Sequence, residues 1–242
     1  MSPGPRAAAV AGTALAEVVG ARSLLAVCAH PDDESFGLGA VLDALARAGV
    51  SVSVLSFTHG EMSTLHGLGR PGEETGGLGA VRSAELAAAA AALGAEGVLL
   101  LDHPDGGLDE VRLEVLVDEV ARYAGERRAE ALLAFDVGGV TGHPDHVRAT
   151  EAALAAGERL GVGVLGWVVP ASVAEALNSE FGTAFGGRRA HEVDVVAAVE
   201  RTVQGRAIAC HASQSSANPV LWRRLELQGG TEWLAWLRRP PG

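Results

Sequence analysis

The 242-residue sequence has few cysteines, few aromatic residues and fewer basic than acidic side chains. Cysteine occurs only at Cys28 and Cys210, and no Cys-x-x-Cys pair is present, which argues against a zinc site built from thiolates. We expect both to be small buried side chains of a protein in a reducing compartment. Aromatic residues make up only 4% of the chain, so the core must be built from Ala, Val and Leu.

The charge balance and the lack of long apolar runs exclude several kinds of partner. The 19 basic residues, all of them Arg, face 30 acidic ones, and the formal net charge is -11. Nucleic acids and anionic membranes attract basic surfaces, so neither is an expected partner. No segment is long and apolar enough to span a bilayer. Residues 1–21 are Ala-rich but interrupted by Glu17, so we expect a leading helix and not a signal peptide, and a cytoplasmic location.

Four short apolar runs have the character of buried parallel strands. They are Leu24–Ala29, Val52–Phe57, Val98–Leu101 and Ala131–Phe135. Helical patterns follow them, at about residues 37–48, 81–93, 109–125 and 144–160. This alternation predicts an α/β fold with a mostly parallel sheet flanked by helices. No internal repeat or linker is visible, so we predict one domain over residues 1–242.

After Leu160 the pattern is weaker. Residues 162–169 and 191–195 are candidate strands, and residues 195–211 have the pattern of a helix. We expect the tryptophans of the C-terminal tail to pack a terminal helix.

A polar cluster follows each of the four predicted strands. The clusters are HPDDE at His30–Glu34, THGE at Thr58–Glu61, DHPDGG at Asp102–Gly107 and GHPDH at Gly142–His146. The carboxyl ends of parallel strands meet at one edge of a sheet, and open α/β sheets bind ligands at that edge. We therefore predict a site at the carboxyl edge, overhung by the glycine-rich segment 59–79.

The first and last clusters contain the donors of a metal site. His30 and Asp33 are three residues apart, and Pro31 occupies the favoured first position of a helix, so both side chains can face one point. His143 and His146 repeat this spacing, again with a proline in second place. Two histidines and one carboxylate suit a catalytic zinc, which keeps a position open for water. A dication would also neutralise the crowded acids. We expect Zn²⁺, with Fe²⁺ as the alternative.

The remaining polar residues suggest the roles that hydrolysis requires. Asp32 points away from Asp33 around the turn, so its carboxylate can lie near the metal without binding it, as a general base must. Zinc lowers the pKa of its water to about 7, and the base completes the deprotonation. A histidine off the metal could stabilise a developing oxyanion, with its ring held by Asp145. The third cluster is expected to be mainly structural, with Asp105 near the ligands or the substrate.

These motifs resemble the LmbE/PIG-L family of zinc-dependent N-deacetylases. The resemblance rests on AHPDDE, THGE, LDHPDGGL and GHPDH, together with VDVVAAVERTVQGRAIACHASQ at residues 193–214. It spans about Leu24 to Gln214. It implies a Rossmann-like fold, a single deacetylase domain, and removal of an N-acetyl group from an amino sugar or glycoconjugate such as an N-acetylglucosamine derivative.

The resemblance also assigns roles residue by residue. It implies that His30, Asp33 and His146 bind the metal, that Asp32 is the base, and that His143 and Asp145 assist at the carbonyl. The choice of His146 over His143 as ligand comes from the family. Expected substrate contacts are His59, Glu61, Arg82 and Asp105. Two positions depart from the family pattern, because His59 stands where Arg is common and Thr141 where some members have Tyr.

Three other functions fit parts of this pattern. The same centre could act as an amidase on a thiol conjugate or a natural-product intermediate, which only a substrate panel can distinguish. A non-catalytic sugar- or nucleotide-binding module would need closely spaced glycines after the first strand, and FGLGAV has only two, placed after the acids. A glycosidase is disfavoured because the adjacent Asp32 and Asp33 diverge instead of flanking a bond. The expected partner is a small N-acetylated sugar, and self-association is left open.

Overall fold

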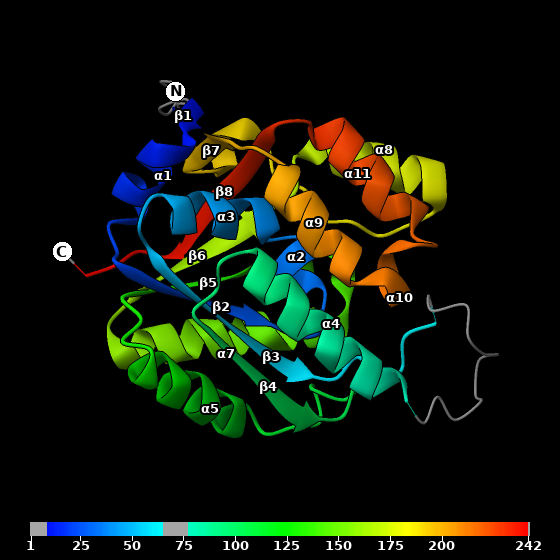
Figure 1. Ribbon diagram of the computed structural model, residues 1–242. Coiled ribbons are helices and arrows are strands. Elements are labelled where there is room, and N and C mark those ends of the chain that lie inside the picture. The colour runs from blue at the N-terminus through cyan, green and yellow to red at the C-terminus, as the bar shows by residue number, and fades with distance from the viewer. Residues whose placement is uncertain (1–8, 65–76, 242) are drawn as a thin grey trace.

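The computed structural model describes residues 9–64 and 77–241 and shows one sheet with helices on both faces (Figure 1). The strands are β1 (Ala9–Ala11), β2 (Ser23–Cys28), β3 (Ser51–Thr58), β4 (Gly97–His103), β5 (Ala131–Phe135), β6 (Gly163–Val168), β7 (Val195–Ala198) and β8 (Thr231–Arg238). The helices are α1 (Gly12–Val19), α2 (Asp33–Phe36), α3 (Gly39–Arg47), α4 (Leu78–Ala92), α5 (Leu113–Glu126), α6 (Gly139–Gly142), α7 (Pro144–Leu160), α8 (Ala171–Phe181), α9 (Thr202–Cys210), α10 (Ala212–Ser215) and α11 (Pro219–Gln228), with a 3₁₀ turn at Ala190–Glu192. Most of the predicted glycine-rich loop lies outside the described residues.

The sheet is mostly parallel, as the sequence predicts. Within the described residues its strand order is β1-β7-β8-β6-β5-β2-β3-β4. Only β8 runs antiparallel, pairing with β6 on one side and β7 on the other. The α/β architecture and the first four predicted strands are confirmed, with boundaries within one or two residues for β2, β3, β4 and β5.

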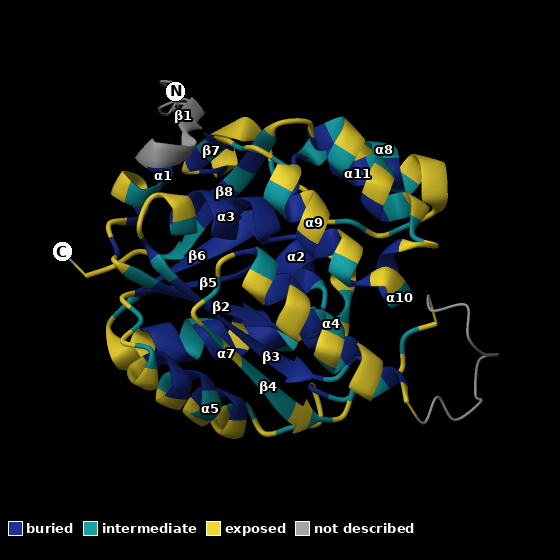
Figure 2. Ribbon diagram, viewed as in Figure 1, coloured by how far each residue is buried: buried dark blue, intermediate teal, exposed yellow. Residues whose placement is uncertain are grey.

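β2, β3 and β5 are buried on both faces because helices cover each side, whereas the edge strand β4 is only half-buried. In β2, Leu24, Ala26 and Cys28 pack into a core shared with α1, α3, α4 and α9. Leu25 and Val27 point the opposite way into a core shared with α5 and α7. This alternation explains why β2 is an unbroken apolar run in the sequence. Figure 2 shows the buried strands between helices with exposed outer faces. No helix in the described ranges has the length and apolar character needed to cross a bilayer.

The topology places the site between two strands far apart in sequence. The chain runs from β2 outward through β3 to β4, and then returns to β5 on the other side of β2. The register pairs Leu24 with Ala131 and Ala26 with Leu133. Where the strand order reverses in this way, the loops at the carboxyl ends diverge and leave a crevice. The turn after β2 and the start of α7, which follows β5, border that crevice.

The C-terminal part differs from the prediction in three places. Val195–Ala198 forms β7, so the helix expected over 195–211 is wrong in its first half and α9 begins only at Thr202. Trp233 and Trp236 lie in β8, not in a terminal helix. Of the strand expected at 191–195, only Val195 is in a strand, and the 3₁₀ turn ends at Glu192. Short Ala- and Val-rich runs fit either a strand or a helix, and here pairing with β1 and β8 decides.

Candidate active site

The turn after β2 is shaped by the carboxylate of Asp33. Its Oδ2 accepts hydrogen bonds from the backbone N–H groups of Ala29 and His30, both at 3.0 Å. These bonds close the turn between β2 and α2, and they leave Oδ1 facing the ring of His146 across the crevice at 3.2 Å. The local sequence therefore brings the two clusters into contact.

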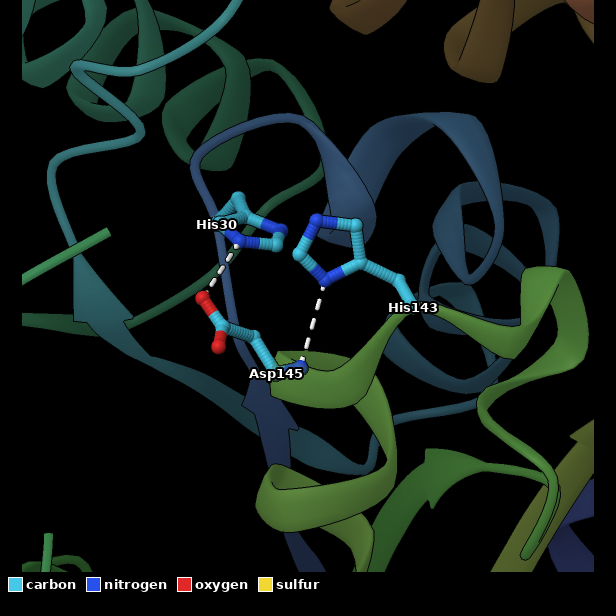
Figure 3. A group of neighbouring side chains, drawn as sticks. All are labelled: His30, His143 and Asp145. Atoms are coloured by element: carbon cyan, nitrogen blue, oxygen red, sulfur yellow. Dashed lines mark hydrogen bonds and ion pairs between the residues drawn. The ribbon is translucent and has the colours of Figure 1, made fainter. Parts of the chain in front are cut away.

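The start of α7 fixes the ring of His143. Pro144 occupies the first turn of the helix, and His143 is the N-cap residue. Its Nδ1 accepts the backbone N–H of Asp145 at 3.2 Å, as Figure 3 shows. An accepting nitrogen carries no proton, so the proton of the neutral ring lies on Nε2. Burial, together with His30 and His146, lowers the pKa of His143 and keeps this ring neutral. His143 lines the cavity and can offer an N–H donor to a ligand there.

Three side-chain atoms converge with the spacing of a metal site. His30 Nδ1 lies 3.1 Å from His146 Nε2, which lies 3.2 Å from Asp33 Oδ1. His30 Nδ1 lies 4.0 Å from Asp33 Oδ2. Nitrogen and oxygen ligands about 2.0–2.1 Å from a tetrahedral zinc are themselves about 3.3 Å apart. The three residues therefore fit a divalent metal.

The other nitrogen of each histidine has an acceptor that orients the ring. His30 Nε2 lies 3.1 Å from Asp105 Oδ1 and 3.2 Å from Asp145 Oδ2. His146 Nδ1 lies 3.1 Å from the carbonyl oxygen of Gly139. A histidine that binds a metal usually donates its second N–H in this way, which leaves the lone pair of the first nitrogen free. The carboxylate of Asp145 was expected to hold His143, but it contacts His30 instead, and only its backbone N–H reaches His143.

A second group of potential donors consists of His30, His143 and Asp145. Most of the potential ligand atoms of Asp145 and His143 already form hydrogen bonds with backbone N–H groups. Asp145 accepts backbone N–H groups with both oxygens, from Gly106 at 2.7 Å and from Leu108 at 3.1 Å. His143 Nδ1 caps the helix. The group of His30, Asp33 and His146 therefore fits a metal better.

The electrostatics of the cluster favour a bound cation. Burial lowers the pKa of His30, but Asp105, Asp145 and Asp33 outweigh it and raise that pKa to about 10. Burial likewise raises the pKa of Asp33, yet His146 and His30 hold it well below its usual range. Carboxylates thus surround the two rings, and positive charge is stabilised at their centre.

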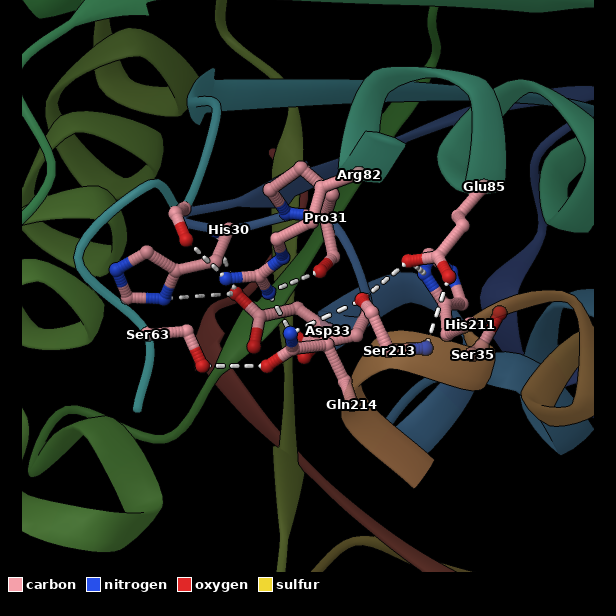
Figure 4. Close-up of polar contacts among 12 residues, drawn as sticks. His30, Pro31, Asp33, Ser35, Ser63, Arg82, Glu85, His211, Ser213 and Gln214 are labelled. Carbon is pink, nitrogen blue, oxygen red and sulfur yellow. Dashed lines mark hydrogen bonds and ion pairs between the residues drawn. The ribbon is translucent and has the colours of Figure 1, made fainter. Parts of the chain in front are cut away.

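Asp32 has a strained backbone that its neighbours hold in place. Its φ of 127° and ψ of -25° are rare for a residue with a side chain. Its N–H donates to Glu34 Oε2 at 2.9 Å. Arg82 Nη2 donates to Asp32 Oδ2 at 2.9 Å. It also donates to the carbonyl of Pro31 (Figure 4). Burial raises the pKa of Asp32 to about 6, with Arg82 opposing the shift. A carboxylate tuned toward neutrality in this way suits proton transfer.

A buried network from the C-terminal part of the chain supports this turn. Glu34 Oε1 accepts the hydroxyl of Ser35 and contacts His211 Nε2, both at 2.6 Å. Beside His211, Ser213 donates its N–H and its hydroxyl to Glu85 at 2.9 and 2.7 Å (Figure 4). The segment around His211 therefore acts on the site through Glu34.

We expect His211→Gln to destabilise the fold by about 3 kcal/mol at pH 6, because it leaves the buried Glu34 carboxylate without its cation. Burial lowers the pKa of His211, but Glu34, with Asp32 and Glu85, outweighs it and raises that pKa. The stabilisation is complete below pH about 6.5 and is lost as the pH rises through the higher folded-state pKa. Urea unfolding at pH 6 and 9 should therefore show a smaller difference from wild type at pH 9. His191→Gln, on an exposed turn, is the control. An equal difference at both pH values would contradict the ion pair.

A cavity of about 620 Å³ opens beside the cluster, a size typical of small-molecule sites. Its lining includes seven of the predicted site residues: His30, Asp32, Asp33, Arg82, Asp105, His143 and His146. The side chain of His59 lies outside the lining and contacts Ser83 and Asp102, both at 2.8 Å. Glu61 is also outside the lining and accepts the N–H of Asp105 at 3.1 Å. Direct substrate contact by His59 or Glu61 stays a prediction.

Part of the remaining wall comes from the segment 59–79 predicted to overhang the site, which contributes Met62, Ser63 and Thr64, but most of that wall carries no signal in the sequence. It is largely apolar and aromatic, with Phe36, Phe135, Trp167 and Phe185, and it includes Arg224 of α11. Among these five residues only Phe135 has a sequence signal, because it is the last residue of a predicted strand at the ligand edge. Thr141, singled out above as a departure from the expected pattern, also lines the cavity, and its hydroxyl lies 3.2 Å from His146 Nδ1.

The fold and this site define an α/β protein with a cluster of two histidines and one aspartate at the carboxyl edge of its sheet. The family model described as PIG-L, GlcNAc-PI de-N-acetylase, matches residues 25–157, and the chain belongs to this family. The 1D-myo-inositol 2-acetamido-2-deoxy-alpha-D-glucopyranoside deacetylase of Kineococcus radiotolerans is 31% identical over 191 residues, covering 66% of this chain and 53% of that protein. The chain spans about half the length of the curated relatives it matches.

Solved structures share the fold at low sequence identity. The N,N'-diacetylchitobiose deacetylase from Pyrococcus horikoshii is 20% identical with a TM-score of 0.63, covering 93% of this chain and 91% of that one. The 4-carboxy-2-hydroxymuconate hydratase from Pseudomonas putida is 18% identical with a TM-score of 0.68, covering 91% and 98%. Since these two proteins differ in activity, the fold alone does not choose a reaction.

Proposed function

We propose that this protein is a metal-dependent hydrolase that removes the N-acetyl group from an amino sugar or glycoconjugate, and that residues 1–242 form a single deacetylase domain. The observation that carries the proposal is the convergence of His30, Asp33 and His146 beside Asp32 and His143 in one cavity. Membership of the de-N-acetylase family supports this reaction over hydration.

The proposed ligands are His30 Nδ1, Asp33 Oδ1 and His146 Nε2, with Zn²⁺ expected and Fe²⁺ as the alternative. When bound, such an ion supplies a Lewis acid that polarises a carbonyl and lowers the pKa of water. Asp105 and Asp145 keep the ring of His30 oriented through its Nε2.

Proton transfer is assigned to Asp32. Its carboxylate accepts a proton from the water that attacks the acetyl carbon, and it returns that proton to the amine nitrogen as the C–N bond breaks. The pKa of about 6 suits both steps near neutral pH. His143 donates its Nε2–H to the carbonyl oxygen as negative charge develops there. The products are acetate and a free amine.

An amidase that acts on a thiol conjugate or a natural-product intermediate would use the same residues. Both forms of the proposal concern small molecules as substrates. The two free cysteines support a cytoplasmic location.

The test is a panel of N-acetylated amino sugars, glycoconjugates and thiol conjugates incubated with zinc- or iron-loaded protein. Released acetate and free amine should appear in equal amounts with at least one compound. Metal-loaded, folded protein that hydrolyses no amide in the panel would count against the proposal.

The variant His143→Ala separates the two candidate groups of ligands. We expect the metal content to stay at wild-type level, because His143 is not a proposed ligand, while kcat falls about 10²- to 10³-fold as the oxyanion loses a donor. Elemental mass spectrometry and steady-state kinetics measure the two effects. Loss of the metal in this variant would favour the group of His30, His143 and Asp145 instead.

A further inference from the structure

The side chain of Arg224 is buried at the wall of the cavity, on the side of Trp167. It is 4% exposed and belongs to the lining. Its guanidinium carbon lies over the ring of Trp167, 5.0 Å from the centroid. Trp167 contacts Phe135, and Phe135 contacts His146, with centroids 5.3 and 5.0 Å apart. Trp167 and Phe135 therefore form an aromatic wall between Arg224 and His146, one of the proposed metal ligands.

The charge of Arg224 is not balanced by a neighbouring acid. Among residues 9–64 and 77–241 no carboxylate forms an ion pair with it. Its Nη1 donates to the amide oxygen of Gln228 at 2.7 Å, and Nη2 donates to the carbonyl of Phe36. These acceptors are both neutral.

Glu232, whose charge acts on Arg224, already has other partners. It accepts from Arg201 Nη1 at 2.6 Å, and from Trp167 Nε1 and Gln228 Nε2, both at 2.7 Å. Glu232 is therefore matched by Arg201, and among the described residues the buried guanidinium of Arg224 has no carboxylate of its own. Burial lowers the pKa of Arg224 to about 10, so the group is still charged at neutral pH. A buried unpaired charge is costly, unless a ligand supplies the partner.

We propose that Arg224 binds an anionic group of the substrate, a carboxylate or a phosphate, while the N-acetyl group lies at the metal cluster. The inference rests on the proposed function and narrows its substrate class to N-acetylated amino sugars that carry an acidic substituent. Arginine has five N–H donors in a planar fork, of which Arg224 uses two in the bonds above, and this fork matches carboxylate and phosphate oxygens. The apolar surroundings strengthen such a pair.

A purely structural role makes a different prediction. The bond from Arg224 to Phe36 holds the end of α2, so losing it could weaken the fold. That role would give no difference between neutral and anionic ligands. The decisive quantity is therefore the affinity for an anionic compound divided by the affinity for its neutral counterpart. A general loss of protein stability leaves this ratio unchanged.

The binding experiment uses amines, because they are not hydrolysed. Calorimetry on metal-loaded protein would compare glucosamine with its 1-phosphate, its 6-phosphate and muramic acid. At least one anionic compound should bind about 10- to 100-fold more tightly than glucosamine. Arg224→Gln should remove that preference. Arg223→Gln, the neighbouring residue whose side chain pairs with Glu180 and Glu226 outside the lining, should keep it.

Several results would overturn the inference. They are equal binding of neutral and anionic compounds by the wild type, or an unchanged preference in Arg224→Gln. If Arg224→Gln does not fold, Arg224→Lys is the second variant, because lysine retains the positive charge. Arg224→Lys should still bind anionic compounds more tightly than glucosamine, by a smaller factor than the wild type. Equal binding of neutral and anionic compounds by Arg224→Lys would count against the inference.

Turnover of the N-acetylated forms of the same compounds separates this inference from the proposed function. Equal hydrolysis of neutral and anionic amides would support the proposed deacetylase activity and would contradict anion binding by Arg224. Arg224-dependent binding of anions without hydrolysis of any of these amides would support the subsite and count against the deacetylase.

Discussion

Replacing Asp32 by Asn is expected to lower kcat by about 10²- to 10⁴-fold while the metal content stays at that of the wild type. The amide cannot accept a proton from water, and it removes no proposed ligand. Asn also tolerates the unusual backbone at this position almost as well as Asp does. Elemental mass spectrometry and release of free amine, measured on the same preparation, test both parts.

The matched control is Asp118→Asn on the outer face of α5, which should leave kcat and metal content unchanged. Its carboxylate is exposed and pairs with Arg159. Wild-type turnover by Asp32→Asn would show that another group accepts the proton. Loss of the metal would show that Asp32 is a ligand or that the turn after β2 has collapsed.

His146→Ala is expected to abolish both metal binding and hydrolysis. Removing an outer partner of a metal ligand typically costs 10- to 100-fold in affinity, so removing a ligand should cost more than about 100-fold. The site would then lose one of its three proposed ligands and retain only His30 and Asp33, which both follow β2. Metal titration of chelator-treated protein gives the affinity, and denaturation with and without metal gives the coupled stability.

His191→Ala is the control for this variant, because His191 lies on an exposed turn. It should bind metal and turn over substrate as the wild type does. A His146→Ala protein that keeps both properties would remove His146 from the metal site. Absence of metal from the wild type, even after incubation with zinc, would reject the catalytic proposal itself.

Local rules predict where the site lies, but they leave both His143 and His146 as possible ligands, and only the family resemblance selects His146. Parallel strands put the residues that follow them at one edge, and Pro31 and Pro144 each mark a turn into a helix. The structure accordingly brings His30, Asp33 and His146 together, and their binding of a metal stays a prediction. The partner of Asp145 could not be read in the same way. The partner of Asp145 depends on how β2 and β5 align. In the observed register the carboxylate of Asp145 faces His30.

Packing decides the features that the sequence does not reveal. Arg223 and Arg224 are adjacent in one helix, and nothing in their type tells which is buried. Only the position of α11 over Trp167 separates them. The strand at Val195–Ala198 is likewise chosen by its neighbours, since a run of Val and Ala gains more there from pairing with β8 than from a helical turn.

Part of the cavity wall comes from a later stretch of the chain than the proposed catalytic residues, although Phe36 and Phe135 lie within the same stretch as those residues. The proposed ligands, Asp32 and His143 all lie within the family match, residues 25–157, whereas Trp167, Phe185 and Arg224 come after it. Chemistry and selectivity can therefore diverge separately in evolution. Grafting the later wall from a relative, with His211 retained to support Glu34, would exchange the accepted substrate and keep the reaction. A mutant library confined to that wall could be screened for new substrates with the catalytic residues untouched.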